Sequence, residues 1–300
     1  MNPRERFART VTDLLDEDLS VALVYAEISG QFFRAAERRH PDRVVNVGIR
    51  EQLLVNVGAG MALTGLRPVV HTFASFLVER AFEQVKLGFS HQDVGGVLVS
   101  SGGSYDNPGG GRTHQAPGDV ALIDTLPDWA VWTPGHADEV ESAVRTAVAG
   151  DGRDYVRVAE QQNREAFAVR AGRMHVVRRG GRATVVAVGP MLDPVLAATE
   201  GLDVSVLYAN SVRPFDAATL RGVLWVPDVV LVEPYLAGTS TRLVEEALVD
   251  QPHRVLGLGV GRDELRRYGS VADHQAAHGL DAAALRRSIV GFLETGVGAA

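Results

Sequence analysis

The sequence has no cysteine among its 300 residues. Disulfide bonds, thiolate zinc sites and cysteine nucleophiles are therefore excluded. The chain also has no run of about 18 apolar residues, the length that a membrane-spanning helix needs. Its first six residues begin no apolar signal-peptide core. We therefore expect a cytoplasmic protein that does not cross a membrane.

Positive charge is also in short supply. The chain carries 30 Lys and Arg against 37 Asp and Glu, which gives a formal net charge of −7. A surface with this balance repels a phosphate backbone, so we expect no binding to nucleic acid. The sequence also has no P-loop lysine signature and no zinc-ligand spacing.

Short apolar runs alternate with amphipathic helical patterns, and this alternation is typical of parallel α/β sheets. The predicted strands cover residues 20–25, 43–47, 68–70, 97–99, 130–132 and 155–158, then 183–189, 204–207 and 228–232. The predicted helices cover residues 32–39, 49–63, 76–89, 118–126 and 138–148, then 193–200, 216–220, 238–249 and 281–294.

The chain is long enough for two domains of roughly 100–200 residues each. Residues 161–182 change character, with several arginines and three glycines, which indicates a connection between two units. We predict a first domain at residues 1–165, a linker at 166–182 and a second domain at 183–300. The predicted fold class is α/β, with two doubly wound, mostly parallel sheets that carry helices on both faces.

The most informative stretch is residues 45–52, where a strand ends and a helix begins. Gly48 provides the turn, and Glu51 lies in the first turn of an apolar helix. The helix dipole stabilises a carboxylate at this position. Among apolar neighbours its burial costs free energy unless the carboxyl group is hydrogen-bonded or neutral. Locally, a helix-capping acid and a catalytic acid both remain open.

Three further features follow Glu51 in order along the chain. Phe73 and Phe76 come after a strand, and His114 follows a glycine-rich loop. A histidine on such a loop is more often functional than one on an apolar helix face. The two phenylalanines are also compatible with ordinary core packing. Among the other histidines we consider only His71 for the site.

These features, taken in order, resemble the pyrimidine-binding domain of transketolases. The first half matches through Gly48-Ile49-Arg50-Glu51, Phe73-Ala74-Ser75-Phe76 and Thr113-His114-Gln115. The second half is similar to the transketolase C-terminal domain through Val188-Gly189, Ser211-Val212-Arg213-Pro214-Phe215-Asp216, Val232-Glu233-Pro234 and Tyr268-Gly269. Each motif alone is weak, so the resemblance depends on their order and spacing. It is strongest to the second subunit of split transketolases, and weaker to deoxyxylulose-phosphate synthase.

The resemblance implies thiamine diphosphate as the cofactor. Glu51 matches the glutamate that hydrogen-bonds the aminopyrimidine ring and so activates the cofactor. Phe73 and Phe76 match the aromatic residues that flank this ring, where a shift of the pair by one residue stays open. Glu27 falls where the family has an acid close to the cofactor, although it can equally cap the end of a strand.

The resemblance also assigns a place for the substrate. His114 is expected to face the substrate and to bind or protonate its oxygen. Arg112 and Ser29 are further candidates for substrate binding, and Arg112 could partly replace phosphate-binding arginines that the chain does not have.

In this family a Gly-Asp-Gly motif and a later asparagine hold the diphosphate through Mg²⁺. The chain contains Gly150-Asp151-Gly152, but Asn163 follows too soon and Asn210 too late, so we interpret the motif as a turn. The resemblance therefore implies a partner subunit that binds the diphosphate and Mg²⁺ (or Ca²⁺), while this chain binds no metal. Family symmetry implies an α2β2 heterotetramer, and the chain alone is expected to be inactive.

We expect a transferase subunit that moves a two-carbon ketol unit from a ketose to an aldehyde. The alternatives are the beta subunit of a 2-oxoacid dehydrogenase, a decarboxylating synthase, or a non-catalytic regulatory subunit. Where the family binds a sugar phosphate, this chain has Glu160-Gln161-Gln162, Ser100-Ser101-Gly102-Gly103 and Gly109-Gly110-Gly111-Arg112. Fewer bidentate arginines weaken phosphate recognition, so we expect a non-phosphorylated or differently charged ketose.

Overall fold

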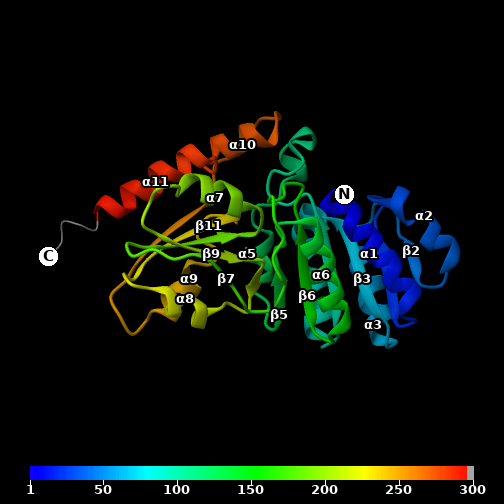
Figure 1. Ribbon diagram of the computed structural model, residues 1–300. Coiled ribbons are helices and arrows are strands. Elements are labelled where there is room, and N and C mark those ends of the chain that lie inside the picture. The colour runs from blue at the N-terminus through cyan, green and yellow to red at the C-terminus, as the bar shows by residue number, and fades with distance from the viewer. Residues whose placement is uncertain (296–300) are drawn as a thin grey trace.

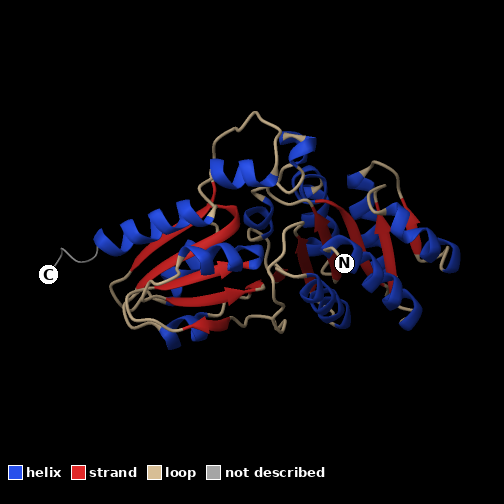
Figure 2. Ribbon diagram, turned by 45° about the horizontal axis from the view of Figure 1, so that its top comes forward, coloured by secondary structure: helices blue, strands red, loops and turns tan. Residues whose placement is uncertain are grey.

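Two mostly parallel sheets form the framework of the protein in a computed structural model that describes residues 1–295 (Figure 1). The first sheet has seven strands in the order β10-β5-β6-β4-β3-β1-β2, and the second has five in the order β12-β11-β8-β9-β7. The described strands pair in parallel, except β10 with β5 and β7 with β9. Helices lie on both sides of the sheets (Figure 2), so the predicted α/β fold class is confirmed.

The first sheet consists of β1 (Val21–Tyr25), β2 (Val44–Asn46), β3 (Arg67–Phe73), β4 (Gly96–Ser101), β5 (Trp129–Trp132), β6 (Arg153–Val158) and β10 (Ser211–Arg213). The second sheet consists of β7 (His175–Arg178), β8 (Thr184–Val188), β9 (Ser205–Ala209), β11 (Asp228–Leu236) and β12 (Arg254–Val260). We call the part of the chain up to β6 the first unit, and the part from β7 onward the second unit.

The helices of the first unit are α1 (Pro3–Glu17), α2 (Gly30–Arg39), α3 (Glu51–Leu63), α4 (Phe82–Gln84), α5 (Asp119–Ile123) and α6 (Ala137–Ala149). Those of the second unit are α7 (Leu192–Ala198), α8 (Ala217–Val223), α9 (Thr241–Ala247), α10 (Val271–Ala277) and α11 (Ala282–Thr295). Two segments are π-helical, η1 (Ser75–Arg80) and η2 (Val85–His91), and three are short 3₁₀ turns, η3 (Pro108–Gly110), η4 (Arg112–His114) and η5 (Gly189–Met191).

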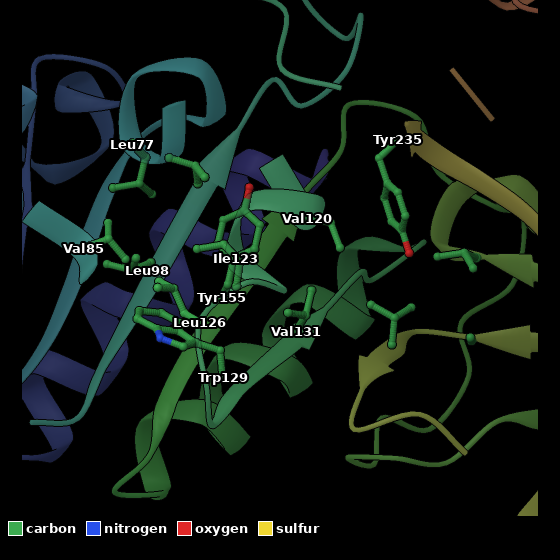
Figure 3. Packing of buried hydrophobic residues seen from close by; sticks show 14 of the residues in the cluster. Leu77, Val85, Leu98, Val120, Ile123, Leu126, Trp129, Val131, Tyr155 and Tyr235 are labelled. Atoms are coloured by element: carbon green, nitrogen blue, oxygen red, sulfur yellow. The ribbon is translucent and has the colours of Figure 1, made fainter. Parts of the chain in front are cut away.

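The central strands are buried on both faces because their β-branched residues meet helices on each side. On one face of the first sheet, α1, α2 and α6 contribute residues such as Phe7, Phe33 and Val144 to a core. The opposite face packs against α3, η1 and η2, and this second core continues into the second unit, where it includes Tyr235 of β11 and Val244 of α9. Figure 3 shows Val120 of α5 between the residues of the first unit and Tyr235 of the second unit. The two units therefore share a continuous apolar core.

The structure adds elements that the sequence pattern did not predict. The predicted linker at 166–182 contains β7, an antiparallel edge strand of the second sheet. The predicted second domain contributes β10 to the first sheet, where Ser211 lies opposite Trp132. The helices α1 and α10 and the strand β12 were also not predicted. Residues 296–300 of that predicted domain lie outside the described part of the chain.

The predicted helix at 76–89 is interrupted. It consists of η1, α4 and η2, so most of its turns are wider than those of an α-helix. π-Helical segments often occur at functional sites, and η1 carries Phe76. Among residues 1–295, no helix has both the length and the apolar character that crossing a membrane requires.

Candidate active site

Glu51 lies where the sequence pattern predicts, at the first residue of α3. The chain turns after β2 at Gly48, whose φ of +69° favours glycine, and the Gly48 N–H donates to Oδ1 of Asn46 over 3.0 Å. Only 2% of Glu51 is exposed. Its carboxyl group is thus buried at the positive end of a helix, where a hydrogen-bond partner is needed.

Arg80, which was not among the predicted site residues, supplies that partner. Its Nη1 donates to Oε2 of Glu51 over 2.7 Å. The same guanidinium lies 4.0 Å from the centroid of the Phe76 ring, within the range of a cation–π contact. Residues four apart lie on one face of a helix, so the spacing of Phe76 and Arg80 indicates from the sequence that their side chains can meet. Arg80 therefore connects the buried acid to the aromatic residues.

Phe73, Phe76 and His114 form a group of three rings in edge-to-face contact. The ring centroids of Phe73 and Phe76 lie 6.1 Å apart, and those of Phe76 and His114 lie 5.1 Å apart. Phe73 and His114 are separated by 5.7 Å. Both phenylalanines are only partly buried, unlike the core residues around them. The structure thus brings together four residues that the sequence separates by up to 63 positions, from Glu51 to His114.

The glycine-rich loop fixes the orientation of His114. A Cβ atom at Gly110 would lie 2.7 Å from Cγ of His114, so the ring can pack there only because residue 110 has no side chain. Nδ1 of His114 lies 3.2 Å from the carbonyl oxygen of Gly110 and 3.0 Å from Oγ1 of Thr113. A carbonyl accepts, so Nδ1 carries the proton and Nε2 of the neutral ring is the acceptor.

A buried polar chain leads from β4 to Arg4, near Phe73. His71 donates from Nδ1 to the carbonyl of Val99 over 2.8 Å, and the hydroxyl of Ser29 donates to His71 Nε2 over 2.9 Å. Nε of Arg4 then donates to the oxygen of Ser29 over 2.8 Å. Burial lowers the pKa of His71 to about 3, which keeps the ring neutral.

This chain of contacts places Arg4 at the site and Ser29 behind it. The Arg4 guanidinium lies 5.8 Å from the centroid of the Phe73 ring. The hydroxyl of Ser29 is buried and already engaged with His71 and Arg4. Arg4 was missed because α1 was missed, although Asn2 and Glu5 form a capping box and Pro3 begins the helix, which together indicate a helix start.

A cavity of about 350 Å³ adjoins Arg4. Gln31 and Phe32 from α2 and Glu160, which follows β6, also line it. Burial raises the pKa of the Glu160 carboxyl group, and the positive charge of Arg4 acts in the opposite direction. The lining therefore combines one carboxyl group with one guanidinium group.

The other predicted site residues lie apart from the ring group. Glu27 has a φ of +58°, is exposed and contacts Asn46, but no described contact joins it to the aromatic rings. Arg112 lies on η4 and donates from Nε to Glu264 of the second unit over 3.1 Å. Gly150-Asp151-Gly152 connects α6 to β6 as a turn. Within residues 1–295, no group of three potential His, Asp or Glu ligands could hold a metal ion.

Comparisons with known proteins bear on the family and on the fold. Residues 1–165 match the family model "Transketolase, pyrimidine binding domain". A protein described as an "Uncharacterized 33.6 kDa protein in fasciation locus" of Rhodococcoides fascians is 50% identical over 96% of this chain and 93% of its own length. The 1-deoxy-D-xylulose-5-phosphate synthase of Oleidesulfovibrio alaskensis is 29% identical over 96% of this chain and 48% of its own length. That of Leptothrix cholodnii is 32% identical, with 90% and 44% covered.

Solved structures show the same fold. A structure described as "Split gene transketolase, inactive beta4 tetramer" superimposes with a TM-score of 0.84 at 25% identity, covering 98% of this chain and 99% of that chain. The transketolase from Leishmania mexicana gives a TM-score of 0.81 at 19% identity and covers 98% of this chain but 46% of that one. The chain thus spans about half the length of the synthases and of this transketolase.

The protein belongs to the transketolase family through its pyrimidine-binding domain, because the family model matches more than half of the chain. The predicted resemblance is confirmed. Within this family, its fold matches the whole length of a split-gene transketolase chain. The families that it matches are thiamine diphosphate enzymes.

Proposed function

We propose that this chain is one subunit of a two-component, thiamine diphosphate-dependent transferase that moves a two-carbon ketol unit from a ketose to an aldehyde. The observation that carries the proposal is the contact group of Glu51, Arg80, Phe76, Phe73 and His114. When bound, the cofactor would supply the carbon nucleophile that attacks the ketose. The residues of this chain would orient the cofactor and handle protons.

Each residue of the group suits one part of that task. Oε2 of Glu51 is held by Arg80, while Oε1 has no hydrogen-bond partner among residues 1–295 and is available to a ring N–H. Phe73 and Phe76 offer aromatic surface to a flat heterocycle. His114 presents Nε2 as an acceptor, so it can take or return a proton on a substrate oxygen.

An exposed apolar face next to Glu51 supports the need for a partner subunit. Ile49 is 73% exposed and Leu53 is 43% exposed on the turn and helix that carry Glu51. Leu87, which is 46% exposed, lies on η2, and η2 packs against α3. These side chains would be covered by a subunit that carries the diphosphate and Mg²⁺ motif. The similar split-gene transketolase structure is described as a beta4 tetramer that is inactive.

The cavity beside Arg4 supports an unusual substrate. Glu160 places a carboxyl group in this cavity, where it opposes the binding of a phosphate dianion. Gly102 leaves the space beside Phe73 without a side chain, since a Cβ there would lie 3.0 Å from the ring. We expect a ketose whose distal end is uncharged or carries both signs of charge. Rates with ordinary pentose phosphates that match those of sugar-phosphate transketolases would contradict this.

A decarboxylating synthase is the second candidate. The named relatives at about 30% identity are 1-deoxy-D-xylulose-5-phosphate synthases, although this chain spans about half of their length. The two reactions differ in the donor, a ketose in one case and a 2-oxoacid such as pyruvate in the other. Release of carbon dioxide from pyruvate by the assembled enzyme, with no turnover of ketoses, would favour this candidate.

The test is reconstitution with a partner subunit that carries the Gly-Asp-Gly and asparagine motif, thiamine diphosphate and Mg²⁺. We expect no turnover by the purified chain alone and ketol transfer by the complex. Glu51→Gln should lower kcat by about 10²–10⁴-fold, the usual contribution of a positioned acid or base. Glu200→Gln, an exposed acid of the second unit, is the matched control. Turnover by the chain alone, or full activity of Glu51→Gln in an assembled complex, would refute the proposal.

A further inference from the structure

A segment of the second unit crosses the glycine-rich loop that carries His114. This segment, residues 261–270, links β12 to α10, and we call it the strap. The ring of Tyr268 on the strap packs against Gly111, where an added Cβ would lie 2.9 Å from Tyr268 Cε1. Gly111 has a φ of +67°, so both the backbone conformation and the close approach require glycine.

Two histidines hold the ends of the strap in place. The N–H of Gly261 donates to His278 Nδ1 over 3.2 Å, and His274 Nε2 donates to the carbonyl of Tyr268 over 2.9 Å. His274 is fully buried, and its ring stacks on Tyr105 of the first unit with centroids 5.9 Å apart. The strap is therefore anchored to both units, and its position relative to the glycine-rich loop is defined.

A hollow of about 270 Å³ lies between the strap and the loop. Its lining includes Gly111, Arg112 and Thr113 from the loop and Arg266, Arg267 and Tyr268 from the strap. Three arginines thus line one small space in a chain whose net charge is −7. Like charges that share a small space repel one another, and an anion between them relieves the repulsion.

The pairing of these arginines leaves donors free. Arg112 uses Nε for Glu264 and Nη1 for the carbonyl of Gln115, while its Nη2 has no hydrogen bond to a described residue. Arg266 and Arg267 form no ion pair and no side-chain hydrogen bond within residues 1–295. Glu264 is thus the one carboxylate paired with these three arginines in the described part of the chain. Asp273 is also close to Arg267, because hydrogen bonds from Ser270 and the charge of Arg267 both lower its pKa. The three arginines of the hollow therefore have two carboxylates near them.

We propose that the hollow between the strap and the glycine-rich loop is a binding site for a phosphate group. Guanidinium forks match the oxygens of a phosphate in pairs, and three arginines line this hollow of about 270 Å³. The site is distinct from the cavity beside Arg4, where Glu160 disfavours a phosphate. Thr113 lines the hollow and precedes His114, so a ligand held here lies on the loop of the candidate active site.

The phosphate can belong to a sugar phosphate or be free inorganic phosphate. The experiment titrates the full-length chain with inorganic phosphate, ribose 5-phosphate and ribose at constant ionic strength, and follows binding by calorimetry. We expect saturable binding of the two phosphate compounds and none of ribose. Tighter binding of ribose 5-phosphate than of inorganic phosphate would assign the site to a phosphate ester, and equal binding would assign it to the free anion.

The variants test the residues. Arg266→Gln with Arg267→Gln should weaken phosphate binding by at least about tenfold, because two charge-assisted contacts are lost. Arg34→Gln with Arg38→Gln is the matched control, since both arginines are exposed on α2 and form no ion pair within residues 1–295. Arg112→Lys keeps the charge but loses the fork and should weaken binding less than the double substitution.

Exposed arginines on the strap can be replaced without loss of the fold, which a thermal unfolding curve of each variant checks. No saturable binding of phosphate to the unmodified chain, or equal binding by the chain with both strap arginines replaced, would overturn the proposal. The measurement needs neither the partner subunit nor turnover. Its failure would therefore leave the proposed function in place.

Discussion

Two arginine–carboxylate pairs differ in how far solvent reaches them. In the pair at the candidate site, 41% of the Arg80 side chain and 3% of the Glu51 side chain are exposed. In the pair between Arg157 and Asp119, the exposed fractions are 2% and 0%. The two pairs have nearly the same separation, 2.7 Å and 2.8 Å. Their environments, and not their geometry, distinguish them.

The buried pair connects the two units. Arg157 on β6 donates from Nε to Asp119 of α5 and from Nη2 to Ser104 over 2.6 Å, and it lies 5.6 Å from the ring centroid of Tyr235 on β11. The space for its guanidinium exists because residue 103 is glycine. A guanidinium in such a place is fixed, because moving it away would leave the carboxylate of its partner buried without a counter-charge. The Arg80 side chain is 41% exposed, so water can take its place at Glu51.

The largest effect is expected from breaking the buried pair. Arg157→Met should lower the free energy of unfolding by about 3–5 kcal/mol, because Asp119 is then left charged and buried without its cation. Urea denaturation measures this change. Arg221→Met, which removes an exposed partner of Asp250, is the control and should leave stability close to that of the unmodified chain. Equal losses in both variants would show that burial does not separate the two kinds of pair.

The pH dependence of stability should also differ between the two regions. Burial raises the pKa of Asp106, near Arg157, to about 7 from 3.8. The folded chain keeps this proton to a higher pH than the unfolded chain does. The protonated carboxyl group therefore contributes its full stabilisation below about pH 4, and this contribution is lost as the pH rises to about 7. His71 has the opposite pH dependence because its pKa is lowered. The neutral ring contributes to the free energy of unfolding above pH 6.5, and this contribution is lost as the pH falls towards 3.

Asp106→Asn removes the first of these two contributions. Between about pH 4 and pH 7 the free energy of unfolding should then fall less steeply with pH. The slope should be smaller than that of the unmodified chain by up to about 1.4 kcal/mol for each pH unit. Urea midpoints across this range provide the measurement. Asp228→Asn, on β11 of the second unit, is the comparison variant for an acid whose ion pair with Arg254 is partly exposed. An unchanged slope in Asp106→Asn would exclude this carboxyl group as the source.

The smallest change in stability is expected at the candidate site. Arg80→Gln should lower the free energy of unfolding by about 1 kcal/mol or less, because the guanidinium is largely solvated and water can reach Glu51 in its absence. The same urea series measures it beside Arg157→Met. A loss as large as that of Arg157→Met would mean that Arg80 is a fixed structural residue, and that water does not take its place at Glu51.

Local patterns predicted much of the fold and of the candidate site. The alternation of apolar runs and helices indicated the α/β class, and the positions of β1, β3, β4, β6 and β8 follow from buried β-branched runs. Where the pattern was weak, elements were missed. The strand β12 contains Gly257 and Gly259, which pack closely against the backbone at residues 235–238, and glycines weaken a strand signal. β10 has three residues and is a strand only because β5 lies beside it.

For the site, Glu51, Phe73, Phe76 and His114 were predicted, and the structure brings them together. Their roles in cofactor and substrate binding stay predictions that the variants above address. Arg4 was missed together with α1. The pairing of Arg80 with Glu51 and that of Arg4 with Ser29 each join residues that are distant in the sequence. Charge and periodicity do not report such pairings.

The sequence by itself determined what depends on neighbours along the chain. Gly48 sets the turn and Glu51 begins the helix, because a positive φ and a helix dipole are local properties. The tertiary structure alone decided that Arg80 holds this acid, that β10 joins the first sheet and that the strap meets Gly111. These contacts depend on which surfaces the crossovers bury against each other, and burial sets the strength of every charge among them.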